Sequence, residues 1–187
     1  MGSDKLESKV KSDANEEIKK ASFWISQIFI LLATVIGVYL AANQGYKQAV
    51  QFDNMKSYKD NYYLQKSLQY ELTDNISILK AYLVKCQDSN YFGARTDPLS
   101  FYTLVWENMK FSSTTLGTPP ELLRDAQRFY REVDRIHNEI AKGNIAISVG
   151  VTQLQEQIDH IEKELLPALD SSTKKIEKIL EGTDVVL

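Results

Sequence analysis

The side chains that could do chemistry in this sequence are two histidines, one cysteine and scattered carboxylates. Asp134 and His137 are three residues apart, and Glu156 and His160 are four apart, so each pair lies on one face of a helix. Di-iron helical bundles bind their metals with two Glu-x-x-His repeats and two further glutamates. Here one pair has the wrong spacing and the other has aspartate instead of glutamate. We therefore favour surface ion pairs over a metal site.

The single cysteine, Cys86, excludes an intramolecular disulfide and a cysteine-based metal cage. A thiol acts as a nucleophile only beside a base, and no histidine is near Cys86 in the sequence, so we interpret it as a half-buried structural thiol. The sequence also contains no phosphate-binding glycine loop, zincin motif or nucleophile elbow. We expect a protein that is not an enzyme, with no catalytic residues, no metal site and no cofactor.

Charge and composition limit the possible partners. The formal net charge is −3 and the sequence pI is about 5.5, whereas a nucleic-acid-binding protein shows a basic face. We therefore expect no nucleic acid partner. Most of the 8 glycines and 4 prolines fall at expected helix boundaries, which is typical of an all-α chain.

The chain is organised around an apolar segment within residues 22–45. From Phe23 to Ala42 no residue is charged. Twenty helical residues span about 30 Å, which is the hydrocarbon thickness of a bilayer, and a helix satisfies its own backbone hydrogen bonds in lipid. We predict a single-pass transmembrane helix over 22–45, with the lipid bilayer as its partner. A cleaved signal peptide is the alternative, but its apolar core is usually only about 7–15 residues long.

Residues 1–21 form a polar tail that mixes acidic residues with lysine, and we expect it to be a disordered, frayed extension of the apolar helix. Five lysines precede the apolar segment and three follow it within the relevant distance. Because positive residues favour the cytoplasmic side, we expect the N-terminus in the cytoplasm. The body would then lie outside a plasma membrane or a bacterial inner membrane.

Residues 46–187 are enough for one domain with its own core. No proline or glycine occurs from Tyr46 to Cys86, which predicts a long membrane-proximal stem helix. Glu71 and Asn75 flank its apolar stripe one turn apart. They could bind a ligand or a partner, but we favour contact with solvent or capping of a neighbouring helix. The apolar stripe is Leu64, Leu68, Leu72, Ile76, Leu79 and Leu83.

Two further helix starts are predicted. Asp97-Pro98 indicates the start of a short helix, with an N-cap acceptor followed by proline. Thr118 and Glu121 have the spacing of a capping box, with Pro119 at the first helical position. The apolar residues of this second helix alternate steps of four and three: Leu122, Ala126, Phe129, Val133, Ile136 and Ile140.

The last helix is predicted from Ala146 to Glu181. Because Pro167 removes a backbone donor, we expect a kink or break at about Leu165. Its inward residues follow the same alternation, which is the period of coiled-coil-like packing: Ile147, Val151, Leu154, Ile158, Ile161, Leu165 and Ala168. The fold predicted is therefore all-α: a single-pass transmembrane helix followed by an antiparallel helical bundle of three long helices and one short one.

Inside the apolar segment, small residues recur at every fourth position: Ala33, Gly37, Ala41 and Gly45. In lipid, helices associate through close backbone approach, so we interpret these four residues as a helix-packing face for another membrane protein or a second copy of this chain.

The expected function is a non-enzymatic, membrane-anchored interaction protein, an accessory or scaffolding subunit of a membrane complex. The alternative is an extracytoplasmic ligand-sensing bundle. In outline such a module resembles the extracytoplasmic domains of bacterial receptors, and it would have to signal through a partner. A third possibility is a di-metal carboxylate enzyme.

Overall fold

The computed structural model of the chain describes residues 3–87 and 92–182, with side chains for 19–87 and 93–182. Within these residues every regular element is helical and no strand occurs, which confirms the all-α prediction. The chain divides into two compact units, Met1–Phe52 and Asp53–Leu187. The division falls within the first helix, and the two units are described separately.

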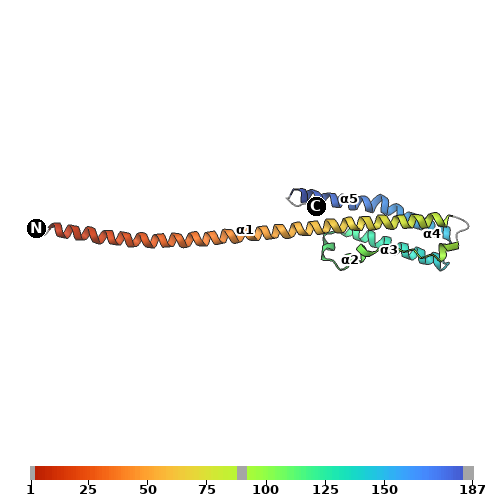
Figure 1. The fold of residues 1–187 in the computed structure, drawn as a ribbon, viewed down its shortest axis with the longest axis horizontal. Coiled ribbons are helices and arrows are strands. Elements are labelled where there is room, and N and C mark those ends of the chain that lie inside the picture. Colours follow the sequence, from red (N-terminus) through yellow and green to blue (C-terminus); the bar gives the residue numbers. More distant parts are fainter. Residues whose placement is uncertain (1–2, 88–91, 183–187) are drawn as a thin grey trace. The chain divides into compact units, whose positions relative to one another are not determined.

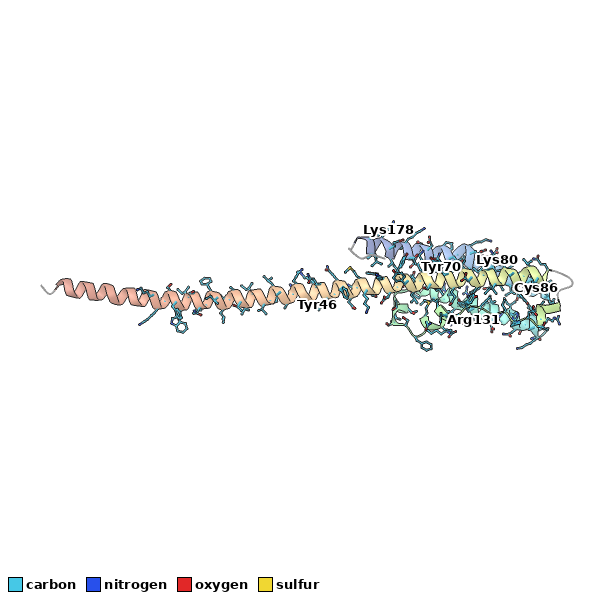
Figure 2. The ribbon with its side chains drawn as sticks, viewed as in Figure 1. Tyr46, Tyr70, Lys80, Cys86, Arg131 and Lys178 are labelled. Carbon is cyan, nitrogen blue, oxygen red and sulfur yellow. The ribbon has the colours of Figure 1, made fainter. Side chains whose placement is uncertain are left out.

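The first unit contains the N-terminal residues of helix α1 (Ser3–Cys86). The helix begins at Ser3, where we expected disorder. Adding residues to an existing helix is much easier than nucleating one, so the apolar turns that follow can extend the helix into the tail. From Phe23 to Leu40 the large apolar side chains of α1 are exposed, and they project from it on the N-terminal side of Tyr46 (Figure 2). This helix is long and apolar enough to cross a membrane.

The second unit is a helical bundle (Figure 1). The helices α4, η3 and α5 form one uninterrupted helical segment, in which η3 is a single π-helical turn. After the C-terminal part of α1, the described elements are η1 (Phe92–Arg95), α2 (Leu104–Met109), η2 (Ser113–Gly117), α3 (Pro120–Ala141), α4 (Ile147–His160), η3 (Ile161–Leu165) and α5 (Leu166–Glu181).

The segment between η1 and α3 runs back along α1. Near one end the Tyr82 hydroxyl donates a hydrogen bond to the carbonyl oxygen of Ala94 (2.7 Å), and near the other the Thr118 hydroxyl donates to Asn61 Oδ1 (3.1 Å). The helix α3 then runs in the direction of α1, and the α4–η3–α5 segment returns (Figure 1). Successive segments therefore alternate in direction, with α2 as the one short helix.

One hydrophobic core lies between these helices. All six residues predicted to face inward on α3 are buried, and so is the α1 stripe except for Leu64, which is half-buried against it. Each fully buried large side chain contributes about 1.5–3 kcal/mol. The core includes Leu68, Leu72, Ile76, Leu79 and Leu83 of α1, the six residues of α3, Leu154 and Ile158 of α4, Ile161 and Leu165 of η3, and Leu169 of α5.

Pro167 follows a π turn that interrupts the α-helical pattern over Ile161–Leu165, where we predicted a kink or break at about Leu165. It has no N–H to continue the α-helical pattern, and the N–H of Leu166 donates to the carbonyl oxygen of Ile161, five residues earlier. The wider turn rotates the following residues on the helix surface. As a result Leu169 is buried, while Ala168, which we predicted to face inward, is exposed.

The predicted capping box before α3 is wrong. The helix begins at Pro120, with Pro119 as the N-cap residue and no side-chain cap. The hydroxyl of Thr118 instead donates to Asn61 on α1. The side chain that we expected to cap α3 therefore makes a tertiary contact. The end of α3 follows the usual rule, because Gly143 lies just beyond it with a φ of 74°, the left-handed conformation that glycine adopts without strain.

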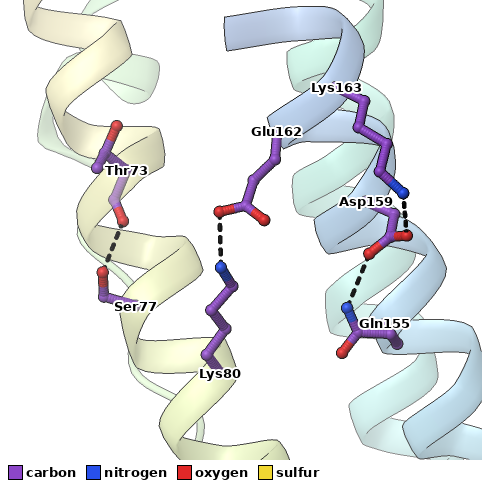
Figure 3. A network of polar contacts seen from close by, with 7 residues as sticks. All are labelled: Thr73, Ser77, Lys80, Gln155, Asp159, Glu162 and Lys163. Carbon is purple, nitrogen blue, oxygen red and sulfur yellow. Dashed lines mark hydrogen bonds and ion pairs between the residues drawn. The ribbon is translucent and has the colours of Figure 1, made fainter.

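Exposed polar contacts also join α1 to the last helical segment. Lys80 of α1 donates a hydrogen bond to Glu162 of η3 (2.7 Å), and Lys163 donates to Asp159 one turn away (2.6 Å) (Figure 3). The Lys163 ammonium lowers the pKa of the Asp159 carboxyl. Exposed ion pairs contribute little to stability, because water screens them. The apolar core therefore dominates the stability of the bundle.

Two phenylalanine substitutions test this core. Phe129 is 1% exposed and Phe111 is 89% exposed. We expect Phe129→Ala to lower the free energy of unfolding of the full chain in detergent by about 3–5 kcal/mol, because it leaves a cavity in the core. The matched change Phe111→Ala should alter it by less than about 0.5 kcal/mol. Equal effects in urea unfolding would show that Phe129 is not in the core.

Candidate functional site

The predicted helix-packing face lies on α1 in the first unit. Ala33, Gly37, Ala41 and Gly45 are all exposed, and a Cβ added at either glycine would meet no atom within 4 Å. Each step of four residues turns about 40° past a full helical turn, so the four positions spread over about 120° of the helix surface. That is broad enough for one neighbouring helix. No described element of this chain covers the face.

Neither predicted histidine ion pair forms. His137 Nε2 lies 3.2 Å from the backbone carbonyl oxygen of Asp97, and His160 Nδ1 lies 3.2 Å from Glu164 Oε2 instead of pairing with Glu156. Within the described part of the chain, no three metal-ligating side chains come together. The two histidines therefore belong to separate surface contacts.

Cys86 lies at the end of α1 and is partly buried against the core. Burial raises the pKa of its thiol, while a hydrogen bond with Tyr82 acts in the opposite direction. A raised pKa keeps the thiol protonated at neutral pH, and a protonated thiol is a poor nucleophile. The half-buried position agrees with our interpretation of Cys86 as a structural thiol.

Glu71 is a buried carboxylate, 6% exposed, that holds the first turn of α2. Its Oε2 accepts a hydrogen bond from the N–H of Val105 (2.6 Å), and its Oε1 accepts one from the N–H of Trp106 (3.0 Å). These are the second and third residues of α2, whose N–H groups an N-cap side chain normally satisfies. The hydroxyl of Tyr130 on α3 also donates to Oε1 (2.8 Å). Glu71 thus caps a neighbouring helix, one of the two roles we favoured.

Asn75, one turn along α1, is fully buried. Its amide donates to the carbonyl oxygen of Tyr102 (2.7 Å) and accepts from the N–H of the same residue (2.8 Å). These bonds hold the chain extended before α2, which therefore begins at Leu104 and not at Asp97-Pro98 as predicted. Glu71 and Asn75 together fix the path of this segment along α1.

A groove of about 450 Å³ lies between α3 and the residues 99–110 that Glu71 and Asn75 hold in place. The rings of Trp106 and Tyr130 are stacked along it, with centroids 5.5 Å apart and planes inclined by 18°. Leu99, Phe101 and Val133 add an apolar surface, and the polar residues that line the groove are Thr103, Glu107, Lys110, Arg131, Asp134 and His137.

Some of the charged side chains around the groove form ion pairs, and one does not. Lys110 Nζ lies 2.8 Å from Glu107 Oε1, and Arg131 Nε lies 3.2 Å from Glu132 Oε1. The exposed carboxylate of Asp134 forms no ion pair or hydrogen bond with any described residue. The groove can therefore bind a molecule that has an apolar or aromatic part and a polar group.

Sequence reasoning did not find this groove. Trp106 lies on the short helix α2, and Tyr130 lies just outside the apolar stripe of α3. The hydrogen bonds that bring both to Glu71 span 35 and 59 residues. The one sequence signal was the pair Glu71 and Asn75, two polar residues beside a leucine stripe.

The buried hydroxyl of Tyr130 gives a testable pH dependence. Burial, and then the hydrogen bond to Glu71, raise the pKa of Tyr130 well above its usual value of 10.0. A folded-state pKa above the unfolded value gives stability that is complete below about pH 10 and is lost as the pH rises towards the folded pKa. Between about pH 10 and 11.5, we expect the free energy of unfolding to fall with pH more steeply than that of Tyr130→Phe. The two slopes should differ by up to about 1.4 kcal/mol per pH unit.

The matched change Tyr70→Phe, at a position that is 67% exposed, should leave this steep fall unchanged. Urea unfolding in detergent across this pH range measures how steeply the free energy of unfolding falls with pH for the unchanged full chain and for each of the two variants. Identical slopes in all three proteins would mean that Tyr130 ionises as readily in the folded chain as in the unfolded one.

No protein-family model, curated protein or solved structure matches this chain.

Proposed function

We propose that the chain is a non-enzymatic, membrane-anchored interaction protein, an accessory or scaffolding subunit of a membrane complex. The observation that carries this proposal is the exposure of the apolar part of α1. Its large side chains are about half to two-thirds exposed, for example Ile28 at 56%, Phe29 at 67% and Leu31 at 66%.

Lipid explains this exposure better than a protein partner alone. Residues 28–32 are five consecutive large apolar residues, and steps of about 100° distribute them around the whole helix. A neighbouring helix would cover only one side. Each such side chain gains about 1.5–3 kcal/mol when it leaves water, and a helix that is apolar all round suits a membrane interior.

Within the membrane, the small-residue face of Ala33, Gly37, Ala41 and Gly45 supports association with another helix. Its exposed backbone permits the close approach that holds helices together in lipid. The partner is another membrane protein or a second copy of this chain.

The groove beside α3 favours a second function, in which the bundle senses a ligand and passes the signal to a partner. Its volume lies in the range of small-molecule sites, about 300–1,000 Å³. Because Glu71 bonds both α2 and Tyr130 of α3, a ligand that moved either one would strain the other. This coupling would provide a route from the groove to α1.

A substitution in the small-residue face tests the interaction function. We expect Gly37→Ile to weaken association in membranes at least several-fold, because a β-branched side chain holds the helices apart, while insertion is unchanged. The matched change Val35→Ile, two residues away, should have little effect. Crosslinking and co-purification from native membranes measure association and separate a second copy from a different subunit. Unchanged association of Gly37→Ile would show that this face is not the interface.

The lysine distribution also predicts topology. In a Cys86→Ser background, a cysteine at Lys142 should react with a membrane-impermeant maleimide in intact cells, whereas a cysteine at Lys5 should react only after permeabilisation. If the cysteine at position 5 reacts in intact cells and the one at position 142 is protected, the orientation is opposite to the one predicted.

A further inference from the structure

We propose that the groove between α3 and residues 99–110 binds an organic cation that carries an aromatic or apolar group. The proposal rests on the second candidate function, ligand sensing, and it assigns the chemical class of the ligand. Three features of the groove support this class: a prearranged pair of aromatic rings, a ring that already lies near a cation, and an unpaired carboxylate.

The aromatic pair is fixed from behind by Glu71. Its Oε1 accepts hydrogen bonds from both the backbone N–H of Trp106 and the hydroxyl of Tyr130. These are the two residues whose rings stack along the groove. Because the carboxylate is buried and each bond is at most 3.0 Å long, the backbone of Trp106 and the phenol of Tyr130 are held in place before any ligand arrives, and the indole stacks on that phenol. A ligand therefore pays little entropy for ordering them.

The ring of Trp106 already interacts with a cation of the protein. Lys110 Nζ lies 5.9 Å from its centroid, within the distance at which a positive charge is attracted to an aromatic face. Tryptophan is the strongest of the aromatic side chains in this interaction. A ligand cation can make the same contact, with its apolar part against Leu99 and Phe101.

The charge balance of the groove also favours a cation. Lys110 and Arg131 each have a carboxylate partner, whereas Asp134 has none among the described residues. An anionic ligand would have to share a cation that already has a carboxylate partner, and it would lie near the unpaired carboxylate of Asp134. A cationic ligand leaves both pairs intact and gains Asp134 as a partner.

The test uses the full chain in lipid nanodiscs with Trp24→Phe, which leaves Trp106 as the only tryptophan. Benzyltrimethylammonium is the cationic probe, phenylacetate the anionic probe and benzyl alcohol the neutral probe. Trp106 fluorescence reports binding at the groove, and saturation-transfer NMR detects any probe that binds without changing it. We expect saturable binding of the cation, at least about tenfold tighter than that of either other probe.

Substitutions of charged residues test how the charges that line the groove contribute to binding. We expect Asp134→Asn to weaken binding of the cation about fivefold, the size of a partly exposed charge contact. The matched change Asp74→Asn, at an exposed site on α1 outside the groove, should leave binding unchanged. Lys110→Met should strengthen binding, because it removes a competing positive charge from the ring of Trp106 while keeping a side chain of similar length.

The outcomes distinguish two questions: whether the groove binds a ligand at all, and whether that ligand is a cation. Preferential binding of phenylacetate or benzyl alcohol, or equal binding of the cation to Asp134→Asn, would overturn the cation assignment and leave the groove as a ligand site. No saturable binding of any probe by either method would overturn both the assignment and the sensing function. Neither result would bear on the interaction function, which Gly37→Ile tests separately.

Discussion

A buried carboxylate that accepts three hydrogen bonds organises one side of the bundle. An isolated buried charge is very unfavourable, so Glu71 is tolerable only because two backbone N–H groups of α2 and the hydroxyl of Tyr130 bond to it. Those bonds determine where α2 begins, how Trp106 meets Tyr130, and therefore the shape of the groove. Loss of Glu71 would leave the first turn of α2 without a cap and the Tyr130 hydroxyl with only the longer hydrogen bond from Asn75 (3.3 Å).

The helix α1 differs in its apolar surface between the two units. In the first unit its apolar side chains are exposed all round, as in a helix that lipid surrounds. In the second unit the same helix has one apolar stripe, which is buried by α3 and by the α4–η3–α5 segment. Our two proposals rest on two surfaces, the small-residue face of α1 and the groove beside α3.

Much of the fold could be predicted because helix periodicity is local. Steps of three and four residues identified every buried position on α3, and the absence of proline and glycine from 46 to 86 predicted an unbroken helix. The errors came where tertiary contacts replaced local ones. Thr118 bonds Asn61 instead of capping α3, and the π turn before Pro167 buries Leu169 in place of Ala168.

The sequence by itself determined the helical class, the apolar segment and the inward faces, because each depends on residues within a few turns of one another. Only the tertiary structure decided the groove and the role of Glu71. The donors to its carboxylate come from 34, 35 and 59 residues away. No local pattern specifies such pairs, because they form only when the packing of three separate segments brings the groups within hydrogen-bonding distance.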